Sequence, residues 1–167
     1  MEICPVDYKK YLEEVKLNGC ALEFVPIKYI TEDLCKISVK QDGWLLHYVP
    51  EEYITEELVK IAVKQNGLAL KYVPIKYKTE DLCKIAVKQD GYVLKYTFSL
   101  QYVPEEYRTE KLCKIAVNQN GLTLSYVPLE YITEEVIFMA QQTLLHDSDI
   151  PTELATRIFK IYKTMGK

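Results

Sequence analysis

The chain has very few of the residues that catalysis or tight anion recognition requires. Its two histidines, His47 and His146, have no evident cysteine or aspartate partner for nucleophilic or acid–base work. The only arginines are Arg108 and Arg157, so bidentate recognition of phosphate or carboxylate is scarcely available. No phosphate-binding loop, dinucleotide fingerprint, nucleophile elbow or zinc-protease motif is present. The sequence therefore predicts a protein that is not an enzyme and that has no catalytic residue, cofactor or metal site.

Long apolar runs and a surplus of one charge are also absent. No run reaches the roughly 18 apolar residues of a membrane-spanning helix, and the first residues include acidic groups without an apolar core. We therefore expect neither a membrane segment nor a secretory signal. The net charge is only −3 and the signs are interleaved, which argues against duplex DNA or an anionic membrane as the partner.

The cysteines lack the spacings of metal or redox sites. There are five of them, without a CxxC pair or a cysteine–histidine pattern typical of zinc. Cys35, Cys83 and Cys113 occupy one equivalent place in an internal repeat, where Val59 stands in another unit. Because a site that accepts valine is small and apolar, we interpret these thiols as reduced packing residues of an intracellular protein.

What the sequence does have is a repeat of 24 residues. Four full units share this pattern, and they occupy residues 25–48, 49–72, 73–96 and 103–126. A six-residue insertion at 97–102 interrupts them, and a fifth unit begins at Val127 and then diverges. We interpret the chain as one repeat domain over 1–167, with a degenerate N-terminal unit or cap at 1–24 and the divergent fifth unit with a helical cap at 127–167.

Each unit carries the start and stop signals of a helix. A threonine stands where an N-cap belongs, at positions Thr31, Thr55, Thr79, Thr109 and Thr133, and a glutamate follows it on the positive end of the helix dipole. A glycine such as Gly43 ends the helix, and we expect it to take the left-handed conformation of a C-terminal cap. The pattern predicts a helix of about three turns from Glu32 to Asp42.

The rest of the unit predicts short turns and close stacking. Residues 44–48 are too short for a normal helix and predict one or two turns, α or 3₁₀, before a valine–proline pair that starts another turn. A small residue recurs inside the helix, as in Ser38 and Ala62, so that a neighbouring helix can approach. Gln41 and its equivalents are expected to hydrogen-bond along the stack or to cap the backbone of the next unit. At the C-terminal end we predict helices over 134–146 and 151–163.

These features predict an all-α fold, because a unit of this size buries its apolar face only by stacking on its neighbours. The predicted architecture is an α-solenoid of 24-residue repeats, each with a three-turn helix and a short α- or 3₁₀-helix. We expect a right-handed superhelix with helical caps at both ends.

The string AVKQNGLALKYVP at residues 62–74, with a threonine–glutamate pair at 79–80, resembles the short helical repeats of unknown function that are abundant in giant DNA viruses of the mimivirus type. The resemblance covers about residues 12–140. It implies a viral or intracellular protein and a helical array, and it carries no established activity. The 24-residue leucine-rich variant repeats share the period but not the residues.

Positions that differ between units are where a repeat array adapts its surface. Alternate units resemble each other most: Ile27-Lys28 recurs in the third unit, and Glu51-Glu52 recurs in the fourth. The single tryptophan is Trp44, a residue type enriched in interface hot spots, although it could merely fill a gap. Our predicted partner-binding residues are Ile27, Lys28, Trp44, His47, Glu51, Glu52, Lys71, Tyr92 and Lys95. Of these, we expect His47 to be exposed.

The predicted function is a non-enzymatic scaffold that binds a protein or peptide, of the host or the virus, along one face. The expected location is the host cytoplasm during infection. One alternative is a nucleic-acid-binding array that uses the repeated tyrosines and lysines, and another is a structural component of the virion. We favour core packing for the tyrosines and a solvated mixed-charge face for the lysines, because acidic residues stand beside them.

Overall fold

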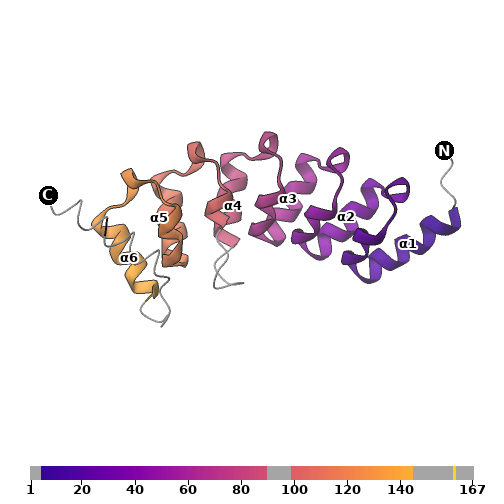
Figure 1. The fold of residues 1–167 in the computed structure, drawn as a ribbon, viewed down its shortest axis with the longest axis horizontal. Helices are drawn as coiled ribbons and strands as arrows, with labels where there is room; N and C mark the ends of the chain where they lie inside the picture. Colours follow the sequence, from indigo (N-terminus) through magenta and orange to yellow (C-terminus); the bar gives the residue numbers. More distant parts are fainter. Residues whose placement is uncertain (1–4, 90–98, 145–159, 161–167) are drawn as a thin grey trace.

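The computed structural model describes residues 5–89 and 99–144, together with residue 160. Six α-helices follow one another in these ranges, and no strand occurs there. Figure 1 shows them as a single elongated row. The helices are α1 (Pro5–Leu17), α2 (Glu32–Gln41), α3 (Glu56–Gln65), α4 (Glu80–Gln89), α5 (Glu110–Gln119) and α6 (Glu134–Leu144). The predicted all-α repeat solenoid is confirmed.

Two kinds of 3₁₀ segment connect the α-helices. The longer ones are η1 (Gly19–Phe24), η3 (Gly43–Tyr48), η5 (Gly67–Tyr72), η7 (Ser99–Tyr102) and η9 (Gly121–Tyr126). The shorter ones follow each valine–proline pair and are η2 (Ile27–Tyr29), η4 (Glu51–Tyr53), η6 (Ile75–Tyr77), η8 (Glu105–Tyr107) and η10 (Leu129–Tyr131). Wherever the structure describes it, the predicted short helix of a unit is therefore of the 3₁₀ type.

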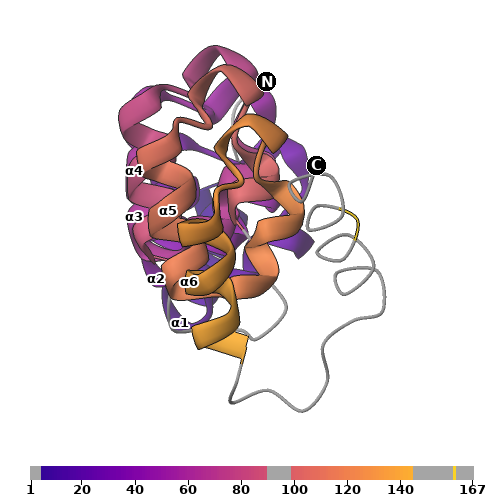
Figure 2. The same ribbon diagram turned by 90° about the vertical axis from the view of Figure 1, so that its left-hand side faces the viewer.

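The elements form two layers with an edge. Viewed along the row, the α-helices line up behind one another on one side and the longer 3₁₀ segments on the other (Figure 2). Consecutive α-helices contact each other, and so do consecutive longer 3₁₀ segments such as η3 and η5. The shorter 3₁₀ segments lie along the upper edge in Figure 1. Each unit therefore contributes one element to each layer and one turn to the edge.

The core runs between these layers without a break. Its largest fully buried side chains are leucines contributed alternately by the two layers, among them Leu34, Leu46, Leu58 and Leu70. Because each leucine packs between its own unit and a neighbouring one, stacking removes from water the apolar surface that one unit could not bury alone.

The predicted threonine caps are present. The Thr31 hydroxyl accepts a hydrogen bond from the Leu34 amide at 3.4 Å, and Thr55 does the same for Leu58 at 3.2 Å. The equivalent bonds exist in the later units at Thr79, Thr109 and Thr133. Each one satisfies an amide that the first helical turn would otherwise leave without a partner.

The glycines at the helix ends differ from the expectation. No described glycine has a positive φ, so the predicted left-handed cap is wrong. Asp42 is instead extended, with a φ of −148°, and its carboxylate accepts from the Trp44 amide. Gly43 is required by a close approach, because a Cβ built there would lie only 2.0 Å from the Ala62 carbonyl oxygen in the next unit. The glycine and the small helix residue therefore form one contact between adjacent units.

Glutamine side chains link α2, α3 and α5 to the helix before each of them. Gln41 donates to the carbonyl oxygens of Val15 at 2.7 Å and Lys16 at 3.2 Å, and its side-chain oxygen accepts from the Gly19 amide at 2.7 Å. Gln65 donates to the Lys40 carbonyl at 3.1 Å. These bonds satisfy carbonyl groups at a helix C-terminus, so the predicted bonding along the stack is confirmed and it runs backward.

The repeat register is restored after the interruption. Ser99–Tyr102 forms η7, which packs against η5 and η9. Leu100 is buried like Leu70 of η5, and the Val103 amide donates to the Leu100 carbonyl as Val73 does to Leu70. Although the sequence placed the extra residues at 97–102, the end of that segment, Ser99–Tyr102, takes the ordinary repeat position.

Several predictions fall outside the described residues. They concern Tyr92, Lys95, the helix expected over 151–163 apart from residue 160, and the last two residues of the helix expected over 134–146. The described part of α6 ends at Leu144. The handedness of the superhelix stays a prediction. Within the described part of the chain, none of the helices has the length and apolar character needed to cross a bilayer.

Candidate interaction surface

The edge formed by the shorter 3₁₀ segments carries the most regular exposed feature of the molecule. We call it the tip ridge, and it comprises the first two residues of each segment: Ile27-Lys28, Glu51-Glu52, Ile75-Lys76, Glu105-Glu106 and Leu129-Glu130. A proline precedes each segment as its N-cap, and a tyrosine that packs against the core ends it. The two residues between them consequently project into solvent.

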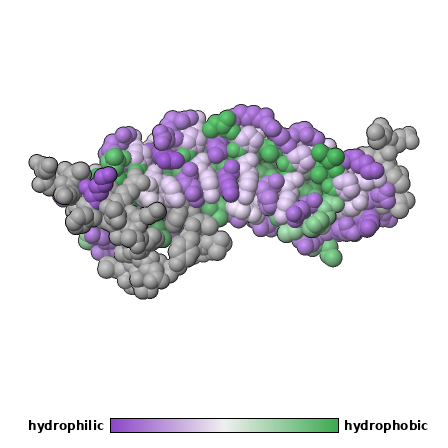
Figure 3. Space-filling view, in the orientation of Figure 1, coloured by the Kyte–Doolittle hydropathy of each residue, from purple (hydrophilic) through white to green (hydrophobic). Residues whose placement is uncertain are grey.

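Apolar and acidic tips alternate along this ridge. Ile27, Ile75 and Leu129 are each 70% exposed, whereas Glu51 and Glu105 occupy the same position in the units between them. Figure 3 shows hydrophobic patches along the upper edge with hydrophilic residues between them. Since isolated exposed apolar residues are common on any protein, the informative observation is their recurrence at every second unit.

The lysines of the apolar tips fold back onto the molecule. The Lys28 ammonium lies 4.7 Å from the centre of the Tyr29 ring, and the Lys76 ammonium lies 5.0 Å from that of Tyr77. Both contacts are cation–π interactions. The isoleucine beside each lysine, Ile27 or Ile75, is 70% exposed.

A second group of predicted residues meets between η3 and η5. The Trp44 ring lies edge-on to Tyr72 at 5.0 Å, and the His47 ring lies 5.2 Å from Tyr72. The Lys71 ammonium lies 6.0 Å from the centre of the Trp44 ring. The structure thus brings Trp44, His47 and Lys71 together in one aromatic cluster, with the tip residues of the prediction on the ridge.

His47 is half-buried in this cluster, which corrects the expectation that it is exposed. Its ring lies 3.7 Å from that of Tyr48, and its Nδ1 atom is hydrogen-bonded to the Trp44 carbonyl at 2.7 Å. Trp44 is half-buried as well. Because these rings contact one another across the unit boundary, the cluster stabilises the packing between the longer 3₁₀ segments. The tip ridge is therefore the better candidate for an interaction surface.

Sequence reasoning missed part of the ridge. It named the tips of the first two units but not Ile75, Lys76, Glu105, Glu106 or Leu129, which the structure places on the same edge. The signal was available, because the alignment of units puts all of them at one repeat position. The alternation was visible from the sequence, whereas the projection of that position into solvent required the fold.

Arg108 and Lys78 were also missed. Both stand where other units have isoleucine, as at Ile54. The Arg108 guanidinium donates to the carbonyls of Val103 at 2.9 Å and Tyr126 at 3.3 Å, and the Lys78 ammonium donates to the Tyr102 carbonyl at 3.0 Å. They satisfy the ends of η7 and η9, so these cations have a structural task next to the interruption of the repeat.

A shallow hollow separates the last two tips. Its volume is about 440 Å³, and Glu105, Arg108, Leu129 and Glu130 are among the residues that line it. Two carboxylates and an apolar side chain at its rim fit a partner side chain that has an aliphatic stem and a cationic end. The hollow therefore extends the apolar and acidic character of the ridge.

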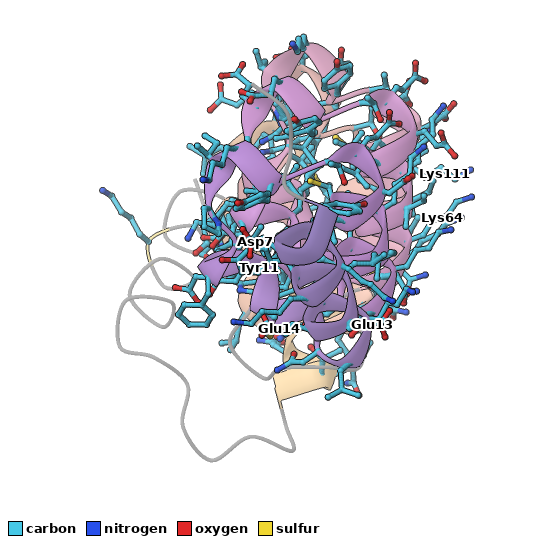
Figure 4. The ribbon with its side chains drawn as sticks, turned by 90° about the vertical axis from the view of Figure 1, so that its right-hand side faces the viewer. Asp7, Tyr11, Glu13, Glu14, Lys64 and Lys111 are labelled. Carbon is cyan, nitrogen blue, oxygen red and sulfur yellow. The ribbon has the colours of Figure 1, made fainter. Side chains whose placement is uncertain are left out.

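The outer face of the α-helices has a mixed charge. Lys36 pairs with Glu32 at 2.8 Å and with Glu57 of the next unit at 3.6 Å. Lys114 pairs with Glu110 at 3.0 Å and Glu135 at 2.8 Å, and the pKa of each lysine is raised, chiefly by hydrogen bonds to these carboxylates. Figure 4 shows Lys64 and Lys111 projecting on this face. The interleaved acids confirm the mixed-charge interpretation of the lysine positions.

The three cysteine thiols that lie within the described α-helices are unsuited to nucleophilic chemistry. Cys35, Cys83 and Cys113 are buried, and burial raises the pKa from 9.0 to about 12 for Cys35 and to about 11 for the other two. A thiol of that pKa is protonated at neutral pH and reacts poorly. The described ranges also contain no cluster of histidine, cysteine, aspartate and glutamate that could hold a metal ion.

Comparison with known proteins gives one partial similarity. A family model described as a domain of unknown function, DUF4116, matches residues 55–98, from the cap of α3 to beyond the end of α4. No curated protein and no solved structure matches the chain. The matched segment contains one tip of the ridge, Ile75-Lys76, and neither of the neighbouring acidic tips.

Proposed function

We propose that this protein is a non-enzymatic scaffold that binds a protein partner along the tip ridge. The observation that supports the proposal most strongly is the 70% exposure of Ile27, Ile75 and Leu129 at one repeat position, with glutamate pairs between them. Exposed apolar groups rimmed by polar residues are typical of interaction sites. A solvated surface without a partner would gain nothing from this periodicity.

The ridge defines the chemistry of the partner. Its apolar tips need apolar sockets, and its glutamate pairs need cationic groups between those sockets. Neighbouring units of packed helices are about 8–10 Å apart, so sockets for successive apolar tips would be spaced about twice that distance. Because the tips project, the partner is a folded protein with a groove. The proposed partners are proteins of a host cell or of the virus that the resemblance to giant-virus repeats suggests.

The helix layer is a poorer candidate surface for nucleic acid. A phosphate backbone is bound by cations whose counter-ions it releases, and Lys36, Lys84 and Lys114 already have carboxylate partners within 4 Å. The half-buried tyrosines pack against the core and do not form an open stacking platform. These contacts support a protein partner over a nucleic acid.

A tip-exchange variant tests the proposal. The variant Ile27→Glu, Lys28→Glu, Glu51→Ile, Glu52→Lys exchanges the first two tips, keeps composition and net charge, and uses residues native to this turn in neighbouring units. Tagged native protein and variant are incubated with the same cell lysates, and bound proteins are compared by quantitative mass spectrometry. We expect one set of proteins to be enriched on the native chain and lost on the variant, because the alternation is broken.

A Trp44→Leu variant serves as the matched control, since Leu68 occupies that position in the next unit. It changes the aromatic cluster and leaves the ridge intact, so it should retain the enriched proteins. Equal binding by the native chain and the tip-exchange variant, with both folded by circular dichroism, would refute the ridge as the binding surface.

A further inference from the structure

The N-terminal end of the stack carries an apolar stripe that no described unit covers. We call it the end stripe, and it consists of the exposed Leu17 and Phe24 and the half-buried Ala21. The repeat shows which way these positions face. Their equivalents in the next unit are Gln41, Leu45 and Tyr48, and all three reach back onto the unit before them.

The contacts of these equivalents are specific. Gln41 bonds the Val15 and Lys16 carbonyls. A Cβ built on Gly19 would lie 2.8 Å from a methyl group of Leu45, so Leu45 lies against that glycine. The Tyr48 hydroxyl is hydrogen-bonded to Glu23 of the preceding unit, and this bond is the main reason that its pKa is raised. In the first unit, the same three positions therefore face the end of the stack.

Compared with the equivalent residues of the internal units, Leu17 and Phe24 are less polar, whereas an end exposed to solvent is expected to be more polar. Terminal repeats usually have a polar outer face. Here leucine replaces glutamine and phenylalanine replaces tyrosine, which removes the polar group at both positions. Leu17 is 91% exposed and Phe24 is 75% exposed, more than any other large apolar side chain in the described residues. When an apolar residue replaces a polar one at a position that the described chain leaves exposed, we infer that a binding partner shields this surface from water.

We propose that a second copy of this chain covers the end stripe, in an antiparallel pair related by a two-fold axis. Antiparallel pairing sets Leu17 opposite Phe24 of the second copy and places Ala21 at the axis, where its small side chain allows close approach. Such a patch is complementary to itself, as an isologous interface requires.

The charges around the stripe fit the same arrangement. Exposed Lys16 precedes Leu17 and exposed Glu23 precedes Phe24, so each lysine comes near a glutamate of the second copy. On α1, Glu13 and Glu14 lie at the end of the molecule (Figure 4), where they pair with Lys16 and Lys10. These groups give the apolar centre a polar rim, the usual composition of a protein interface.

A further repeat unit is a poorer occupant than a second copy. The C-terminal end of a preceding helix presents carbonyl groups, and in the stack these are satisfied by a glutamine such as Gln65. Leu17 has no donor, so carbonyls buried against it would lose their hydrogen bonds. An apolar surface such as a second end stripe has no such requirement.

Sedimentation velocity tests this pairing. The full chain is measured at protein concentrations from micromolar to the highest that is soluble. The native chain should shift from monomer to dimer as concentration rises, because an interface of this small size gives weak association. The variant Leu17→Gln, Phe24→Tyr restores the residues of the internal units, and we expect it to weaken the dimer at least tenfold. The control Ile27→Glu, Lys28→Glu alters an exposed tip and should dimerise as the native chain does.

Two outcomes would overturn the inference: a native chain that is monomeric throughout, or a dimer that Leu17→Gln, Phe24→Tyr leaves unchanged. A second measurement locates the axis. In a Cys4→Ser, Cys20→Ser background, Ala21→Cys should form a disulfide dimer on mild oxidation, since residues at a two-fold axis approach closely enough to bridge. Lys64→Cys in the same background should not. Loss of dimerisation would leave the ridge proposal standing, because the two surfaces share no residue.

Discussion

The tightest constraint at the scale of single residues is the contact between a glycine and the next helix. Gly43 stands where any side chain would meet the backbone of Ala62, and Gly67 has the same relation to Ala86. In both cases the obstacle is a main-chain carbonyl, which cannot rotate away as a flexible side chain would. A larger residue at either the glycine or the alanine position would force adjacent units apart.

We therefore predict that Gly43→Ala destabilises the protein by about 3 kcal/mol, at the upper end of overpacking costs. Ala62→Ser is the matched control, because serine is native at this position as Ser38, where its hydroxyl donates to the Gly19 carbonyl at 2.9 Å. It should cost far less. Chemical denaturation monitored by circular dichroism measures both, and a Gly43→Ala variant as stable as the native chain would contradict the close contact.

The buried thiols make stability depend on alkaline pH. Cys35, Cys83 and Cys113 have raised pKa values in the folded protein, so the unfolded chain loses its thiol protons at lower pH than the folded one. Their contribution to stability is complete below pH 9 and declines as pH rises toward 11 or 12. The sign follows from linkage between proton binding and folding.

Replacing all three with valine, the native residue at Val59, should flatten this decline. We expect the unfolding free energy of the native chain to fall more steeply between pH 9 and 11 than that of the variant. Both chains retain the lysine ion pairs, whose loss at high pH is common to them. The unfolding free energy of both chains is measured by urea denaturation at each pH. If it depends on pH identically in the native chain and the valine variant, the thiols are exposed to water and the prediction is contradicted.

At the scale of the element, the helices are joined by glutamines that bond backward. Gln41 makes three hydrogen bonds with the first unit, two to carbonyls and one from the buried Gly19 amide. Gln65 donates one hydrogen bond, to the Lys40 carbonyl. The same repeat position thus contributes unequally to different boundaries.

This difference predicts that Gln41→Leu costs about 2 kcal/mol and Gln65→Leu about 1 kcal/mol or less, in proportion to the hydrogen bonds lost. Leucine is the native residue at Leu17, so it is compatible with a helix end of this type. Thermal unfolding of the two variants provides the comparison. Equal costs, or a larger one for Gln65→Leu, would contradict the assignment of the bonds.

Most elements could be predicted because their signals are local. A threonine cap, a glutamate after it and an apolar stripe are read from neighbouring residues, and Thr55 and Glu56 begin α3 as expected. Gly43 was misassigned because its constraint lies in Ala62 of the next unit, which no local rule describes. The position of the extra residues was similarly hidden, since either 91–96 or 97–102 could continue the pattern until Leu100 was found in the core.

The candidate site was predicted in part for the same reason. Variation between units identified Ile27, Lys28, Glu51 and Glu52, which the structure places on the tip ridge. The same criterion also selected Trp44 and His47, which are half-buried against each other and Tyr72. Variation marks positions that tolerate change, and only the packing shows whether such a position faces solvent or a neighbouring ring.

For the whole molecule, the surface pattern of the tip ridge repeats over a pair of units. One unit supplies an apolar tip and the next supplies an acidic one, so the surface period is twice the structural period. The core residues beneath them hardly change from unit to unit, as Leu34 and Leu58 show. A regular core therefore carries an alternating edge, and the partner is expected to match the edge.

Side-chain footprinting of the native chain, alone and with the proteins it captures, tests the ridge most directly. Hydroxyl radicals label exposed isoleucine, leucine and phenylalanine, and mass spectrometry reports the labelling of each. The ridge account predicts that Ile27, Ile75 and Leu129 lose labelling together on binding, while Phe138 of α6, which is 60% exposed, keeps its own. Unchanged labelling of all three tips in a bound sample would contradict it.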